Sequence, residues 1–195
     1  MTSGQLALLC LLGLTFTLKG VTSQARCSVP EWPSGIDGEN PLQLHAGKVL
    51  LVALMQGYCR YCWIQAHNLE RLRDHLHNRG FSDVEMILIN GGGALSRINN
   101  ETYAQYTNLT VYQDTANNTL FNLFGGEKDD FIIYDRCGQR VARLTRRFSY
   151  LGHTYTERAL RAIHRGFSWC SCSLDPQTSR TRRSANNWMV PLANN

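Results

Sequence analysis

Two continuous apolar segments predict strands that are buried on both faces. Val49–Met55 reads Val-Leu-Leu-Val-Ala-Leu-Met, and Val84–Ile89 is a second such segment, which ends at the glycines of positions 91–93. Apolar runs of this length are typical of parallel strands covered by helices on both sides. From Cys62 to Arg79 apolar side chains recur every three or four positions, which predicts an amphipathic helix that ends at Gly80.

The second half of the chain predicts shorter elements. We expect a polar helix at 95–106, a strand at 109–113 and a short helix at 118–124. A hairpin of two strands follows at 130–134 and 139–144, and a final amphipathic helix at 156–167. Gly138 supplies the backbone angles that the hairpin turn needs. The alternation of strands and helices predicts an α/β fold, with a central mixed sheet flanked by helices and an antiparallel edge.

The two ends of the chain differ from this central domain, 48–172. Residues 1–25 contain an apolar run, too short to cross a bilayer, followed by small polar residues, as in a secretory signal peptide. Residues 26–47 hold three of the five prolines and predict an irregular lead-in. Residues 173–195 are polar and basic and predict a disordered tail. We therefore expect a secreted, extracellular protein without a membrane span.

Composition narrows the class of protein further. A chain of 195 residues that is 43% hydrophobic has the size and core of one folded domain, which excludes a disordered protein. Its net charge of +5 is below the basic density of nucleic-acid binders, so no nucleic-acid partner is expected. Three glycosylation sequons, at Asn100, Asn108 and Asn117, lie close together and predict a glycosylated face.

The motif that carries chemistry is Cys59-Arg60-Tyr61-Cys62, where the first strand turns into the first helix. Free N–H groups and the dipole of a helix start stabilise negative charge, and Arg60 adds a cation, so Cys59 is expected to react as a thiolate. Cys62 belongs to the apolar stripe and is expected to be buried and less acidic. An exposed attacking sulfur with a buried resolving sulfur is what thiol–disulfide exchange requires. The sequence shows no separate general base.

Other roles for the cysteines stay open. CxxC in a secreted protein can belong to a static disulfide framework, or supply half of a zinc site with Cys170 and Cys172. CxC is a poor ligand spacing, so no metal is predicted. The four remaining cysteines are candidates for structural disulfides with three possible pairings, and a shuttle role for the CxC pair is an alternative; they are Cys27, Cys137, Cys170 and Cys172.

Two groups of arginines are candidate sites of another kind. Arg143, Arg146 and Arg147 form a candidate surface for heparan sulfate or another polyanion, although separate solvated arginines are the commoner case. In the tail, Arg180, Arg182 and Arg183 are typical of a furin-type processing site, and a chance cluster is the alternative.

Three segments of the chain resemble the N-terminal domain of the selenoprotein P family. They are residues 49–56, Cys59-x-x-Cys62 with Gln65-Ala66, and the run Lys-Asp-Asp-Phe-Ile-Ile-Tyr-Asp-Arg-Cys-Gly at 128–138. The resemblance extends over residues 27–172. It implies a thioredoxin-like fold, a secreted glycoprotein, and a link to selenium transport and extracellular antioxidant defence. A cell-surface receptor is a candidate partner in the alternative, non-catalytic interpretation.

The sequence departs from this family pattern at three points. Cys59 stands where the family usually has selenocysteine, so slower peroxide turnover is expected, and selenium is a cofactor only if position 59 is selenocysteine. The selenocysteine-rich and histidine-rich C-terminal region of the family has no counterpart here, so bulk selenium delivery is not expected. Thioredoxin-like proteins place a cis-proline opposite the active cysteine, and the matching position is predicted to be Thr110.

Together these features predict a secreted thiol–disulfide oxidoreductase or hydroperoxide reductase. Cys59 would attack a disulfide or hydroperoxide substrate, and Cys62 would resolve the mixed disulfide or sulfenic acid. The alternative is a non-catalytic extracellular carrier or receptor-binding module, in which every disulfide is static.

Overall fold

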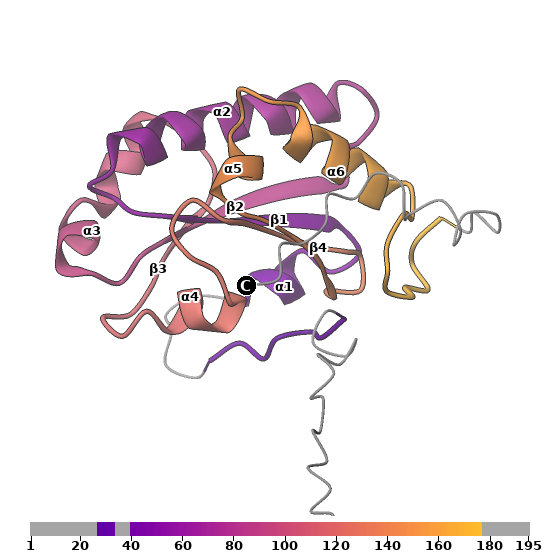
Figure 1. Cartoon of the computed structure of the whole chain (residues 1–195), viewed down its shortest axis with the longest axis horizontal. Coiled ribbons are helices and arrows are strands. Elements are labelled where there is room, and N and C mark those ends of the chain that lie inside the picture. The colour runs from indigo at the N-terminus through magenta and orange to yellow at the C-terminus, as the bar shows by residue number, and fades with distance from the viewer. Residues whose placement is uncertain (1–26, 34–39, 177–195) are drawn as a thin grey trace, which may run out of the picture.

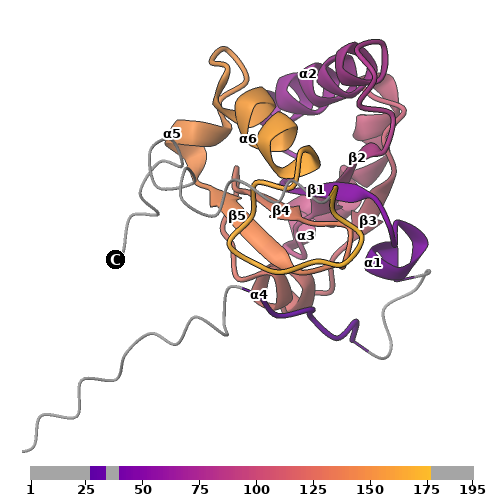
Figure 2. The same cartoon turned by 90° about the vertical axis from the view of Figure 1, so that its right-hand side faces the viewer.

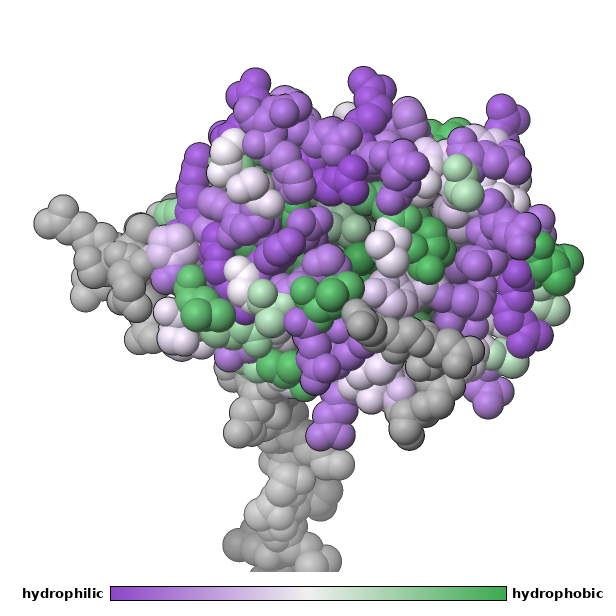
Figure 3. Space-filling view, turned by 180° about the vertical axis from the view of Figure 1, so that it is seen from behind, coloured by the Kyte–Doolittle hydropathy of each residue, from purple (hydrophilic) through white to green (hydrophobic). Residues whose placement is uncertain are grey.

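The structure, a computed structural model, describes residues 27–33 and 40–176 (Figure 1). The predicted signal peptide and the arginines at 180, 182 and 183 lie outside the described residues, as does most of the predicted tail. Within the described part, no helix is long and apolar enough to cross a membrane. Polar residues cover most of the face seen in Figure 3, and apolar residues appear there in small separate patches.

A five-stranded sheet forms the centre of the molecule. In sheet order its strands are β3 (Val111–Gln113), β2 (Val84–Asn90), β1 (Val49–Met55), β4 (Phe131–Tyr134) and β5 (Arg140–Leu144). The first three strands are parallel, while β4 runs antiparallel to β1, and β5 antiparallel to β4. The mixed sheet with an antiparallel hairpin at its edge confirms the predicted architecture.

Helices cover both faces of this sheet (Figure 1). They are α1 (Pro41–Leu44), α2 (Arg60–His77), α3 (Ala94–Ile98), the 3₁₀ helix η2 (Asn100–Gln105), α4 (Thr119–Phe124), α5 (Arg146–Ser149) and α6 (Tyr155–His164). Helices α2, α5 and α6 lie on one face, and α1 and α4 on the other. Side chains of a strand alternate between faces, so β1 contributes to two cores. Val49, Leu51, Ala53 and Met55 pack under α2 and α6, whereas Leu50, Val52 and Leu54 pack against α4.

The polar helix predicted at 95–106 is wrong as a single element. Two separate pieces form instead, α3 and η2, because side chains compete with the backbone for the carbonyls that would continue α3. Asn99 Nδ2 donates to the Leu95 carbonyl at 2.7 Å, and the buried Asn90 donates to the Ser96 carbonyl at 2.9 Å. The lead-in also contains a helix that was not predicted, α1, whose first turn is capped by the side chain of Asn40.

Two disulfides decide among the three possible pairings. Cys27 bonds to Cys170 and Cys137 to Cys172, so the lead-in, the hairpin turn and the segment after α6 are tied together. Figure 2 shows this last segment looping over the end of the sheet. Because Cys170 and Cys172 are both disulfide-bonded, they are not available as zinc ligands together with Cys59 and Cys62.

Candidate active site

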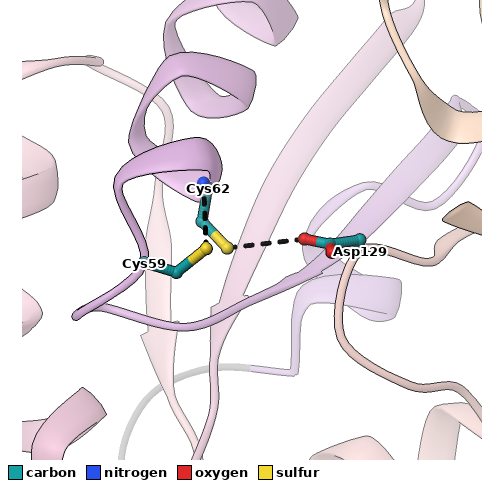
Figure 4. Close-up of side chains that lie close together, drawn as sticks. All are labelled: Cys59, Cys62 and Asp129. Carbon is teal, nitrogen blue, oxygen red and sulfur yellow. Dashed lines mark hydrogen bonds between the residues drawn. The ribbon is translucent and has the colours of Figure 1, made fainter.

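The CxxC motif lies where β1 ends and α2 begins, as the sequence predicted. Cys59 is the N-cap residue of α2, and its sulfur accepts a hydrogen bond from the Cys62 backbone N–H at 3.4 Å (Figure 4). The preceding turn is fixed by Gly57, whose N–H donates to the side chain of Asn90 at 2.7 Å. A Cβ at Gly57 would lie 2.6 Å from the Ser96 carbonyl oxygen, so only glycine allows α3 to pack this closely against the motif.

The two sulfurs occupy different environments. Both are free thiols, with Cys59 half-buried and Cys62 completely buried. Burial raises the pKa of the Cys62 thiol well above its ordinary value, and the hydrogen bond and charge of Cys59 raise it further. Cys62 is therefore protonated at neutral pH, in agreement with the prediction of a buried and less acidic second sulfur.

A buried carboxylate faces Cys62. Asp129 is 2% exposed, and the Cys62 thiol donates to its Oδ1 at 3.5 Å (Figure 4). The backbone of Asp129 lies in the left-handed region, with a φ of 73°, which costs a non-glycine residue about 1–3 kcal/mol. Its N–H donates to the Leu54 carbonyl at 2.8 Å, and its carbonyl accepts from the Ser149 hydroxyl. Gln65 in turn donates to the Ser149 carbonyl at 3.0 Å, so neighbouring elements hold Asp129 toward Cys62.

A lysine next to this carboxylate contacts the other sulfur. Lys128 Nζ lies 3.5 Å from Cys59 Sγ and 2.9 Å from Asp129 Oδ2. Burial opposes its charged form, but the contact with Asp129 and the charges of Cys62 and Cys59 outweigh that effect and raise the pKa of Lys128. Arg60, which the sequence favoured as the cation, is exposed. The ammonium group in contact with Cys59 therefore comes from Lys128.

One further prediction about this site is wrong. Thr110 was expected to face the active cysteine, but it precedes β3, which the sheet order separates from β1 by β2. The residue opposite the motif is Asp129, just before β4, because β4 is the strand that pairs with β1 on the other side. The sequence also showed no general base, whereas Asp129 is placed to accept the Cys62 proton.

Aromatic side chains surround the motif. Trp63 donates from its indole N–H to the Gly57 carbonyl at 2.7 Å and stacks on Tyr106 with ring centroids 5.4 Å apart. Trp63 therefore packs on Tyr106 and also fixes the turn before Cys59. Tyr61 stacks on Tyr150 at 6.5 Å on the same helix start.

The ligand atoms of Cys59, Cys62 and Asp129 lie within 4.8 Å of one another, close enough to hold a metal ion in principle. The ammonium group of Lys128 opposes a second cation at this point, because it contacts both Cys59 and Asp129. The charge of Lys128 therefore disfavours a metal ion at these three residues.

The remaining predicted sites in the described part of the chain are the three sequons and the arginines at 143, 146 and 147. Asn117 is exposed, Asn100 is half-buried and accepts from Asn90 at 3.2 Å, and Asn108 is exposed but bonds to Glu70 through both its amide nitrogens. Among the arginines, Arg143 is neutralised by the buried Asp130, with Nε 2.8 Å from its Oδ2, while Arg146 and Arg147 are exposed.

Comparisons with known proteins agree on the kind of domain. The chain matches the family described as "Selenoprotein P, N terminal region" over residues 22–190. It is 32% identical over 169 residues to selenoprotein Pb of Danio rerio, covering 85% of this chain and 63% of that protein. It is 36% identical over 166 residues to selenoprotein P of Homo sapiens, covering 80% and 42%. The chain thus spans less than two-thirds of the length of these relatives.

Among solved structures, the chain is similar to a thioredoxin-like protein determined in its oxidized form. The TM-score is 0.52 at 13% sequence identity, and the match covers 72% of this chain and 96% of the other. This similarity shows a thioredoxin-like fold.

Proposed function

The chain belongs to the selenoprotein P N-terminal family, and we propose that it is a secreted thiol–disulfide oxidoreductase or hydroperoxide reductase that works through Cys59 and Cys62. One observation carries the proposal. The accessible sulfur of Cys59 contacts an ammonium group, while the buried thiol of Cys62 contacts a carboxylate. An anionic attacking sulfur and a protonated resolving sulfur are thereby provided within one turn of helix.

In the first step, the Cys59 thiolate attacks the substrate. Lys128 at 3.5 Å and the Cys62 N–H at 3.4 Å stabilise its negative charge. With a disulfide, a bond forms between Cys59 and one substrate sulfur, and the other sulfur leaves as a thiolate that takes up a proton. With a hydroperoxide, the S–O bond forms as the O–O bond breaks, giving a sulfenic acid on Cys59 and an alkoxide that takes up a proton and leaves as the alcohol.

In the second step, Asp129 accepts the proton of Cys62, and the Cys62 thiolate attacks Cys59. A Cys59–Cys62 disulfide forms, and the second substrate thiol, or water, leaves. Two electrons have then passed from the two protein thiols to the substrate. An external dithiol must return them before another turnover.

Trapping the intermediate tests this proposal. With a chromogenic disulfide, Cys62→Ser is expected to accumulate a mixed disulfide at Cys59, whereas the matched Cys59→Ser variant should accumulate none. Asp129→Asn should keep the first step and slow the second about 10²- to 10⁴-fold, the usual contribution of a general base.

A static pair would give a different result. If the Cys59–Cys62 disulfide has a potential below about −300 mV and opens only together with the other two disulfides, it is a structural bridge. The protein would then act as an extracellular carrier or receptor-binding module.

The proposal extends to the setting of the protein. We place it outside the cell as a glycoprotein, since the sequons, the two disulfides and the family all fit secretion. A link to selenium depends on position 59, and the intact mass of the secreted protein distinguishes sulfur from selenium there. Heparan sulfate stays a candidate ligand of Arg146 and Arg147, tested by heparin-column elution after both are replaced by alanine.

A further inference from the structure

A buried tyrosine behind the motif has an unpartnered hydroxyl group. Tyr103 of η2 is 1% exposed, and its hydroxyl has no hydrogen-bond partner in the described part of the chain. Its ring belongs to the same core cluster as Cys59 and Cys62. A buried hydroxyl without a partner costs free energy that phenylalanine would not cost at the same place. The packing therefore explains the ring of Tyr103 but not its hydroxyl.

The electrostatic surroundings of this hydroxyl are those of the redox site. Burial raises the pKa of Tyr103, and negative charge on Cys62, on Cys59 and on Asp129 raises it further, in that order. The phenol therefore keeps its proton throughout the physiological range. The phenol is therefore a hydrogen-bond donor that interacts electrostatically with Cys62, Cys59 and Asp129, the three groups that carry negative charge during the proposed reaction.

We propose that Tyr103 is a positioning residue for the resolving step, whose hydroxyl donates a hydrogen bond to Cys62 Sγ once Cys62 has given its proton to Asp129. This inference rests on the proposed function of the two cysteines. In the resting state the Cys62 thiol donates to Asp129, and its neutral sulfur is a weak acceptor. The thiolate is a strong acceptor, and at 0% exposure it has no water to solvate it. The hydroxyl of Tyr103 then donates the hydrogen bond that water would donate to an exposed thiolate.

Tyr103→Phe tests the inference because it removes only the hydroxyl. The ring packing is kept and an unpartnered polar atom is lost, so the thermal midpoint should stay equal or rise. The assay uses dithiobis(nitrobenzoate), which releases one coloured thiolate when Cys59 attacks and a second when Cys62 resolves. We expect an unchanged first release, a second release slowed about tenfold, and a pH profile of that second step displaced to higher pH, as for a lost charge-assisted hydrogen bond.

Tyr134→Phe is the matched control. Tyr134 is also 1% exposed, but it belongs to the core on the opposite face of the sheet, so its replacement should leave both releases unchanged. An unchanged second release and pH profile in Tyr103→Phe would overturn the role of Tyr103 and leave the proposed function standing. A wild-type protein that releases a single equivalent would instead contradict the redox pair itself, and with it any resolving step for Tyr103 to assist.

Discussion

Replacing Lys128 by glutamine removes the cation that contacts the attacking sulfur. Nζ lies 3.5 Å from Cys59 Sγ, where opposite unit charges attract by about 5 kcal/mol at an effective dielectric constant of about 20 and by about 1 kcal/mol in bulk water. The Lys128 side chain is 35% exposed and shares its charge with Asp129, so the lower part of this range applies. We expect a loss of about 1–2 kcal/mol, which lowers the reactivity of Cys59 at neutral pH about 5- to 30-fold.

The assay is alkylation of the reduced protein with iodoacetamide at neutral pH and low salt, followed peptide by peptide so that Cys59 is read alone. Lys128→Arg keeps the charge and should retain most of the rate. Lys48→Gln is the matched control. Lys48 pairs with Glu85 and immediately precedes β1, whereas the motif follows the other end of that strand. Added salt should narrow the difference between wild type and Lys128→Gln, because part of the attraction is screened.

Arg60→Gln tests which cation acts on Cys59: Lys128, as the structure indicates, or Arg60, as the sequence favoured. Arg60 is adjacent to Cys59 in the chain but exposed, so its replacement should change the alkylation rate less than Lys128→Gln does. The reasoning is refuted if Lys128→Gln leaves the rate unchanged, or if Arg60→Gln produces the larger loss.

Three predictions concern stability. Because the folded protein keeps Cys62 protonated above its ordinary pKa of 9.0, the unfolded state binds fewer protons at higher pH, and the free energy of unfolding of the reduced protein should fall above that pH by up to about 1.4 kcal/mol per unit. Urea titrations of Cys62→Ala should lack this slope. Arg136→Met breaks the nearly buried ion pair with Asp175, in which the two groups lie 3.1 Å apart, and should cost about 3–5 kcal/mol, seen as a lower thermal midpoint. Replacing both Cys137 and Cys172 by serine removes a disulfide that links residues 35 positions apart. The unfolded chain gains conformational entropy, so the free energy of unfolding in urea should fall by about 4 kcal/mol. A cost below about 1 kcal/mol in either variant would contradict the corresponding account.

Two errors about the surroundings of the motif share a cause. Arg60 was favoured because it is next to Cys59 in the chain, but the cation that contacts the sulfur is 69 positions away. Thr110 was favoured because it precedes the third strand in chain order, yet that strand pairs on the far side of β2. The order of strands along the chain does not determine on which side of β1 a later strand pairs. The sequence pattern therefore could not predict which distant residues contact Cys59 and Cys62.

Local signals were sufficient for most of the elements and for the place of the motif in the fold. The apolar run of β1 and the stripe of α2 are properties of neighbouring residues, and they alone place Cys59 at a helix start and Cys62 on a buried face. Burial, period and turn chemistry act over a few residues, which is why the sequence determined the α/β layout and the positions of Cys59 and Cys62 in it.

The partners of that pair were decided only by the tertiary structure. Asp129 and Lys128 reach Cys62 and Cys59 from 67 and 69 positions along the chain, because the antiparallel pairing of β4 with β1 brings the turn before β4 to the end of the motif. The same long-range folding selected one of three disulfide pairings and buried Tyr103 in the same core cluster as the two cysteines. Contacts of this kind depend on how the strands are ordered in space, and a periodic pattern of apolar residues fixes which face a side chain takes but not which distant residue it meets.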